Sequence, residues 1–124
     1  MMPKILLVSS DENNLEALAG ALVLDPKVSL FWARSAGDAL KIAGDEHPQL
    51  AVIDSALSGK NPLKLVAELI SVDAMINTAL VSAMGDKEFH ETSEGLGIMA
   101  RLPERPDDKD AARLLAALGG LVRE

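Results

Sequence analysis

Cysteine and tyrosine are both absent from this chain of 124 residues, and tryptophan occurs only once. Without cysteine the chain has no disulfides, no thiolate metal ligands and no cysteine nucleophile. The aromatic residues are Phe31, Trp32 and Phe89. They are too few for a base-stacking platform or for a flavin held between two rings. The absences exclude thiol chemistry and argue against nucleotide stacking.

Basic residues are also fewer than acidic residues. Lysine and arginine number 12 against 19 acidic residues, so the net charge is −7 at pH 7. Binding to nucleic-acid phosphates needs clustered basic residues, so we expect no nucleic-acid binding by this domain. No apolar run has the length of a membrane span, and the first residues lack the apolar stretch of a signal peptide. We therefore expect a cytoplasmic protein that does not enter a membrane.

Apolar residues, in contrast, make up 48% of the chain. At this length we expect a single domain over residues 1–124 with its own core. Short apolar runs rich in branched residues predict strands, and turn signals bound each of them. The expected strands are Lys4–Val8, Val28–Ala33, Leu50–Ile53, a strand within Met75–Ser82, and Ile98–Leu102.

Segments of helical periodicity separate the strands. Helix-start signals precede most of them: Asp11, Ser35, Asn61-Pro62 and Asp107-Asp108. We expect the second helix to end at Gly44, and the acidic segment 85–97 to form a short, poorly anchored helix. The expected buried faces are Leu15, Leu18, Ala19, Leu22 and Val23 in the first helix, Ala36, Ala39, Leu40 and Ala43 in the second, Leu63, Val66, Ala67 and Ile70 in the third, and Ala111, Leu114, Leu115, Leu118 and Val122 in the last.

Strands that alternate with helices predict a doubly wound α/β fold, (βα)5, in which helices cover both faces of a five-stranded parallel sheet. The continuous apolar strands belong in its centre and the weaker second and fifth strands at its edges, which gives the order 2-1-3-4-5. In this order the connection reverses between the first and third strands, where such sheets bind ligands. Asp54 ends the third strand there, facing Ser9 and Ser10, with Ser82 nearby. Asp54 is therefore the leading candidate site residue.

Several motifs have the order and spacing of a known family. Pro48–Asp54 resembles the pattern Pro-Asp-Leu-x-Leu-x-Asp, Leu57-Ser58-Gly59 resembles Met-Pro-Gly, and Val81-Ser82-Ala83 resembles the end of a fourth strand. Together they resemble the CheY-like receiver domain of two-component response regulators, which has the flavodoxin-like fold expected above.

The resemblance implies a phosphorelay signalling module rather than an enzyme. It makes Asp54 the acceptor of a phosphoryl group from a partner histidine kinase, hence a phosphoprotein, and Ser82 the hydroxyl that reads the phosphate. It also implies that a kinase or output domain binds to the fourth helix, fifth strand and fifth helix. For this chain we expect partner contacts at 89–96 and around Arg113, with little dependence on the state of Asp54.

The metal site departs from the family pattern. Receivers hold Mg²⁺ with the acceptor, a backbone carbonyl two residues later, here Ala56, and an acidic pair that is replaced here by Ser9 and Ser10. Neutral hydroxyls are poor substitutes, because Mg²⁺ prefers carboxylate oxygens. Asp11 is the nearest other carboxylate, but it is better explained as a helix cap. We expect Mg²⁺ binding to be weak at best.

The phosphate-pairing lysine and the switch aromatic are also missing. An ungapped count places Glu104 where the family has lysine, and one inserted residue places Arg105 there, which could pair an aspartyl phosphate through two bonds. The aromatic position falls on Arg101 or Leu102. The usual relay from hydroxyl to aromatic ring therefore cannot operate in its usual form.

Three functions remain open. The first is a degenerate receiver that acts by protein–protein interaction, which we favour. The second is a fully functional phosphoaccepting receiver. The third is a small flavodoxin-like cofactor-binding domain, which the segment Ser9–Asn13 disfavours because it has no glycine and carries two acids that would repel a phosphate.

Overall fold

The computed structural model describes residues 3–55, 57, 61–83, 85–93 and 95–121 of the chain. Its strands are β1 (Lys4–Val8), β2 (Ser29–Ala33), β3 (Leu50–Ile53), β4 (Asn77–Val81) and β5 (Ala100–Leu102). They form one parallel sheet in the order β2-β1-β3-β4-β5. The predicted fold class and strand order are confirmed.

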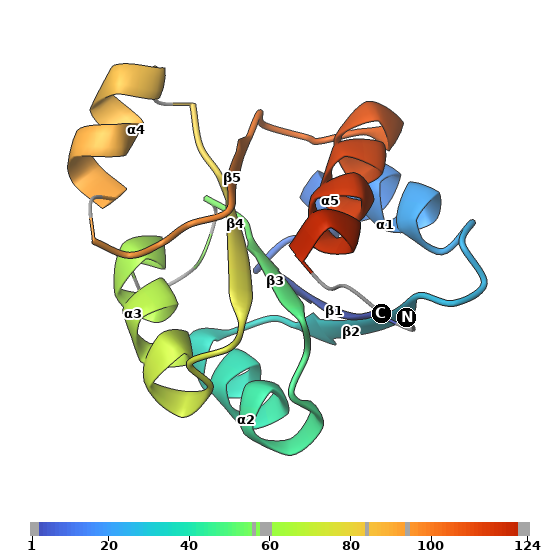
Figure 1. Ribbon diagram of the computed structural model, residues 1–124, viewed down its shortest axis with the longest axis horizontal. Coiled ribbons are helices and arrows are strands. Elements are labelled where there is room, and N and C mark those ends of the chain that lie inside the picture. Colours follow the sequence, from blue (N-terminus) through green and yellow to red (C-terminus); the bar gives the residue numbers. More distant parts are fainter. Residues whose placement is uncertain (1–2, 56, 58–60, 84, 94, 122–124) are drawn as a thin grey trace.

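The helices cover the two faces of this sheet. The 3₁₀ turn η1 (Glu12–Leu15) leads into α1 (Glu16–Leu22), which packs beside α5 (Asp108–Leu121) on one face. On the other face α2 (Ala36–Glu46) packs against α3 (Pro62–Val72), and α4 (Asp86–Ser93) follows them (Figure 1). Within the described residues, every helix is too short or too polar to cross a membrane.

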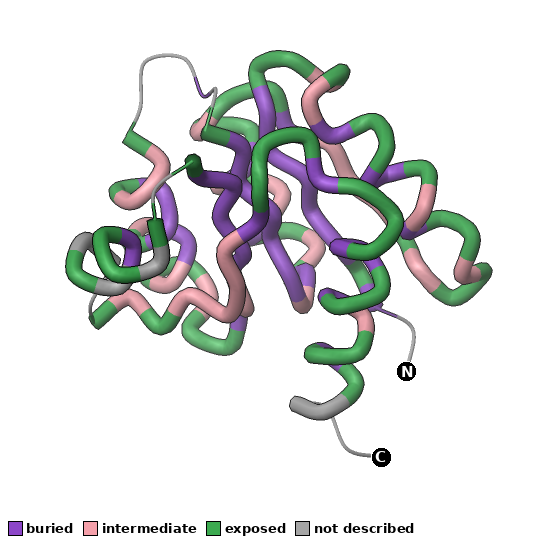
Figure 2. Tube along the Cα trace, turned by 90° about the horizontal axis from the view of Figure 1, so that it is seen from above, coloured by how far each residue is buried: buried purple, intermediate pink, exposed green. Residues whose placement is uncertain are grey.

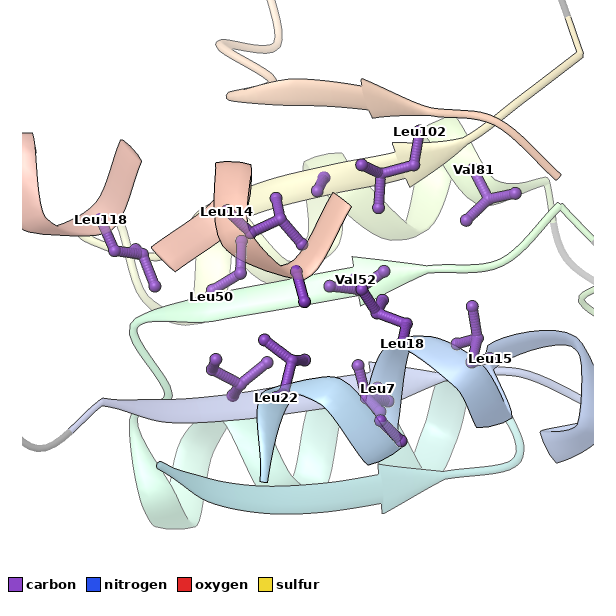
Figure 3. Packing of buried hydrophobic residues seen from close by; sticks show 14 residues of the cluster. Leu7, Leu15, Leu18, Leu22, Leu50, Val52, Val81, Leu102, Leu114 and Leu118 are labelled. Atoms are coloured by element: carbon purple, nitrogen blue, oxygen red, sulfur yellow. The ribbon is translucent and has the colours of Figure 1, made fainter. Parts of the chain in front are cut away.

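The central strands are buried on both faces, as Figure 2 shows for the middle of the molecule. All four residues of β3 are buried, as are the last four of β1. Alternate side chains point to opposite faces, so these strands contribute to two separate cores. The core beneath α1 and α5 is mainly leucine (Figure 3), and it includes Leu7, Leu18, Val52, Leu102 and Leu114.

The second core lies beneath α2 and α3 and also takes in Phe89 of α4. Its members include Leu6, Ile53, Leu65, Leu69 and Leu80. We expected α4 to be short and poorly anchored. It is short, and among its described side chains Phe89, which is 7% exposed, is the one that is buried and joins this core.

The end of α2 also differs from the prediction. Gly44 lies inside the helix, which continues to Glu46 and closes at His47 in the left-handed conformation, with φ 49°. The next residue, Pro48, disfavours the helical conformation at His47 and cannot itself extend the helix. Proline, rather than glycine, therefore sets this boundary.

The buried face of α3 is rotated from the one we predicted. Leu65, Val66 and Leu69 are buried, whereas Ala67 is exposed and Leu63 and Ile70 are half-buried. Apolar residues occur on several sides of this helix, so their spacing alone does not select one face. Packing against β3 and β4 selects the face of α3 that is buried.

One further expected core residue is not in the core. Val23 is 52% exposed, because α1 ends at Leu22 and Val23 lies past its last turn. Leu115 is half-buried and packs against the core beneath α1 and α5, while Val122 falls outside the described residues.

Replacement of Leu65 by alanine tests the observed face of α3. Leu65 is fully buried, so Leu65→Ala should lower the free energy of unfolding by about 2–5 kcal/mol through lost burial and a residual cavity. The matched control is Met75→Ala, since Met75 is 85% exposed; its effect should stay within about 0.5 kcal/mol. Urea denaturation followed by circular dichroism measures both. Equal effects would contradict the assigned face.

Candidate functional site

Three polar residues lie one step beyond the ends of neighbouring strands. The backbone N–H of Ser9 donates to Ala33 O at 3.0 Å, that of Asp54 to Val8 O at 2.9 Å, and that of Ser82 to Leu102 O at 3.0 Å. Each bond continues the ladder of its strand by one residue, so the sheet itself fixes the three positions. All three residues are buried. The predicted meeting of strand ends at one edge of the sheet is confirmed.

Asp54 lies at the centre of the C-terminal end of the sheet and is only 2% exposed. Ser9 Oγ lies 2.6 Å from Asp54 Oδ2, and Asn14 Nδ2 donates to the same oxygen at 3.0 Å. A buried carboxylate is costly unless hydrogen-bond donors compensate it. Here a hydroxyl and an amide compensate Oδ2, while the described residues supply no partner for Oδ1.

Ser9 also organises the turn that follows β1. Its Oγ accepts from the N–H of Asp11 at 3.0 Å and lies 2.7 Å from Asp11 O. A hydroxyl carries one proton, so Ser9 donates either to Asp11 O or to Asp54 at any moment. The same side chain therefore links the acidic centre to the start of η1.

Asp11 acts as a helix cap in the structure. Its Oδ1 accepts from the N–H of Asn13 at 3.0 Å, and its backbone is extended, as expected at an N-cap. Its side chain is exposed, and so is Ser10, while Ala56 lies outside the described residues.

Among the described residues, the buried part of this donor set offers Mg²⁺ a single carboxylate, Asp54. The ion prefers several oxygen ligands in an octahedral shell, with carboxylates among them. Asp54 Oδ2 is within hydrogen-bonding distance of two neutral donors, Ser9 Oγ and Asn14 Nδ2. Within the described part of the chain, no group of three or more acidic, histidine or cysteine side chains is placed to hold a metal.

Sequence reasoning missed Asn14. The signal was weak: asparagine is unfavourable inside a helix and is favoured in turns and caps, and Asn14 lies in the first turn after β1. In the structure Asn14 lies within the 3₁₀ turn η1, and its amide reaches Asp54 Oδ2 from there.

The side chains of Arg101 and Leu102, the two candidates for the switch position, lie on opposite faces of the sheet. Leu102 is buried in the core beneath α1 and α5. Arg101 pairs in register with Leu80, so its side chain lies on the opposite face, and its Nη1 donates to the backbone O of Ser82 at 3.2 Å. Arg101 is therefore the residue on the α4 face of β5.

The structure does not bring Arg105 close to Asp54. It lies in the loop between β5 and α5 with φ 52°, and its side chain is exposed. No hydrogen bond or ion pair links it to the described residues.

A cavity of about 270 Å³ lies between the end of β4, the start of α3 and α4. Its wall is mainly apolar, and Ser55 places it beside Asp54. The lining residues are Ser55, Asn61, Pro62, Leu63, Leu80, Val81, Ser82 and Phe89.

Removal of the Ser9 hydroxyl tests the compensation of Asp54. Ser9→Ala should lower the free energy of unfolding by about 1–3 kcal/mol, because it leaves a buried carboxylate short of a donor. The loss should be smaller in an Asp54→Asn background, and a double-mutant cycle measures this coupling. Ser55→Ala, an exposed serine next to Asp54, is the control. Absence of coupling would contradict the assigned hydrogen bond.

No family model matches the chain. One curated relative is sporulation initiation phosphotransferase F of Bacillus subtilis (strain 168), 23% identical over 113 residues, which cover 91% of this chain and 90% of the relative.

Solved structures give a closer view of the fold. The signal receiver domain of an HD domain-containing protein from Pseudomonas fluorescens Pf-5 is 26% identical with a TM-score of 0.81, over 96% of this chain and 88% of that one. The chemotaxis response regulator CheY4 of Vibrio cholerae is 13% identical, also with a TM-score of 0.81, over 95% and 99% of the two chains. The chain therefore has the CheY-like fold, and along nearly all of its length it is similar to response regulator receiver domains.

Proposed function

We propose that this receiver domain signals by protein–protein interaction and that its Mg²⁺-dependent phosphorylation at Asp54 is impaired. The observation that carries the proposal is the pair of neutral donors, Ser9 Oγ and Asn14 Nδ2, on Asp54 Oδ2. In this arrangement a hydroxyl and an amide stand beside the carboxylate, where receivers have an acidic pair and a metal ion. The chain retains the carboxylate, and its described residues do not supply the acidic ligands that would hold a metal ion to neutralise an incoming phosphoryl group.

A working phosphoacceptor is the second candidate. Asp54 Oδ1 supports it, because the described residues supply no partner for that oxygen and it would be the attacking atom. The buried hydroxyl residue Ser82, at the end of the strand next to β3, supports it as well. The lysine substitute Arg105 supports neither candidate, since its side chain is exposed in its loop.

A flavodoxin-like cofactor site has less support. The turn after β1 uses its polar groups internally: Ser9 and Asp11 bond to each other and to the backbone of η1. The first turns after β1 also carry Glu12 and Glu16, whose charges oppose a phosphate.

The link between Arg101 and Ser82 supports signalling that is independent of Asp54. Arg101 Nη1 donates to the backbone carbonyl of Ser82. This bond does not require the hydroxyl to turn toward a phosphoryl group. The surface formed by α4, β5 and α5 is then the proposed site for a kinase or output domain.

We infer the residues of that surface from their exposure. Lys87 and Glu91 of α4 are exposed, as is Arg113 of α5, which pairs with Asp110. Phe89 points into the core and so would support the surface without contacting a partner.

Restoration of the acidic pair tests the metal part of the proposal. Mg²⁺ should not raise the melting temperature of the wild-type protein at low millimolar concentration, whereas it should raise that of the Ser9→Asp, Ser10→Asp double variant, because a ligand that binds only the folded state stabilises it. Intact mass after incubation with Mg²⁺ and acetyl phosphate should show phosphoryl uptake mainly in the double variant.

The Asp54→Asn variant is the matched control, in the wild-type and double-variant backgrounds. It should take up no phosphoryl group in either. Full uptake by the wild type would favour the working phosphoacceptor, and uptake by Asp54→Asn would refute Asp54 as the acceptor.

A photo-crosslinking amino acid at Glu91 tests the interaction part. Expressed in its native cells, the protein should give the same crosslinked partner with and without Asp54→Asn. The same crosslinker at exposed Ala17 of α1, on the other face of the sheet, is the control. Loss of the α4 crosslink in Asp54→Asn alone would show that the surface depends on the acidic centre.

A further inference from the structure

The outer edge of β2 is unusually apolar for a strand at the side of a sheet. Within the described chain, no strand pairs with β2 on the side away from β1. Its sequence, Ser29–Ala33, holds no charged residue and no proline. Natural edge strands are commonly protected by lysine, proline or a bulge against pairing with another chain. Here protecting residue types flank the strand, as Lys27 and Arg34, but do not occur within it.

The backbone of this edge offers free hydrogen-bonding groups. Ser29 N–H donates to Pro3 O at 2.9 Å and Ala33 O accepts from Ser9 N–H at 3.0 Å, so the odd-numbered residues of β2 face β1. Backbone groups of successive residues in a strand point to opposite sides. Leu30 and Trp32 therefore direct their N–H and C=O groups outward.

Side chains on both faces of β2 are incompletely covered. Leu30 and Trp32 pack against the core beneath α1, and Phe31 packs against the core beneath α2, but all three are only partly buried. A further strand laid along this edge would bury their outer flanks. It would gain apolar burial together with backbone hydrogen bonds, as in other cases of strand addition.

An acidic groove of about 280 Å³ runs between this edge and α2. Phe31, Trp32 and Ile42 form its apolar part, and Asp38 and Asp45 form its acidic part. Lys41 also lines the groove, and Glu46 lines it while paired with Lys4 at 3.4 Å. Within the described residues, neither Asp38 nor Asp45 is in an ion pair, so both carboxylates remain available to a cationic partner.

We propose that the β2 edge and this groove bind an extended basic segment of a partner protein, which adds a sixth strand to the sheet. Alternate residues of such a segment would place lysine or arginine against Asp38 and Asp45. The residues between them would cover Leu30 and Trp32. This surface is separate from the α4–β5–α5 surface and from Asp54, so the proposal does not rest on the function proposed above.

A second copy of the chain suits the edge less well. A two-fold pairing of β2 with β2 would place the two α2 helices on the same face of the joined sheet, on either side of the junction. The acidic groups of one groove would then face those of the other, on molecules that each carry a net charge of −7. Like charges brought together in this way are unfavourable.

Trp32 is the one tryptophan of the sequence, so its fluorescence reports on this edge alone. The probe is a capped hexapeptide that alternates lysine with valine. It should change the Trp32 emission and shift the amide NMR resonances of Leu30 and Trp32, and its affinity should fall as salt is added. A peptide with glutamate in place of lysine should not bind. Equal binding of the two peptides, or unchanged Leu30 and Trp32 amides, would overturn the proposal.

Two variants at Leu30 separate backbone pairing from side-chain contact. Leu30→Pro removes an outward N–H that β1 does not use, and proline is tolerated at such edge positions. It should weaken peptide binding by about tenfold or more relative to Leu30→Ala, which keeps that N–H; tenfold corresponds to about 1.4 kcal/mol. Thermal melts establish that both variants fold. Equal affinities of these two folded variants would exclude strand addition.

Charge recognition is tested by Asp38→Asn combined with Asp45→Asn. This variant should bind the lysine peptide more weakly and with less salt dependence, while Glu16→Gln, an exposed change on α1, should bind as the wild type does. Sedimentation of the protein without peptide gives the remaining outcome. Dimers that Leu30→Pro abolishes would show that a second copy occupies the edge, and would overturn the basic partner.

Discussion

Burial of β1 and β3 on both faces is the constraint on which the rest of the structure depends. Nearly every side chain of these strands lies in one of two cores, so polar groups are confined to the points where the strands end. Because the strands are parallel and adjacent, their carboxyl ends coincide. Ser9 and Asp54 therefore meet as a consequence of the hydrophobic pattern, before any chemistry of their own is considered.

Much of this follows from the sequence. Leu50–Ile53 is an apolar run that stops at a carboxylate, and this fixes the strand, its central place and the position of Asp54 together. The edge position of β2 follows from its looser alternation. Contacts that depend on the rotation of a helix about its axis do not follow from the sequence. Asn14 reaches Asp54 from the 3₁₀ turn η1, and Leu65 replaces Ala67 in the core because α3 is apolar on several sides.

Single residues in weak patterns were also beyond sequence reasoning. Phe89 is surrounded by charged residues and forms no stripe, yet its ring packs in the core and joins α4 to it. The choice between Arg101 and Leu102 required the register of β5 against β4, since a shift of one residue exchanges the two faces. These are the positions where tertiary packing, and not local preference, decides the structure.

The bond from Arg101 to the Ser82 carbonyl has a mechanical consequence. A side chain that rotates between two positions can signal while the backbone around it stays still. A guanidinium group fastened to a main-chain oxygen instead couples the tip of β4 to β5, so that a displacement of either strand end is carried to the other. Motion at the ends of β4 and β5 would then be a small translation of both strand ends together.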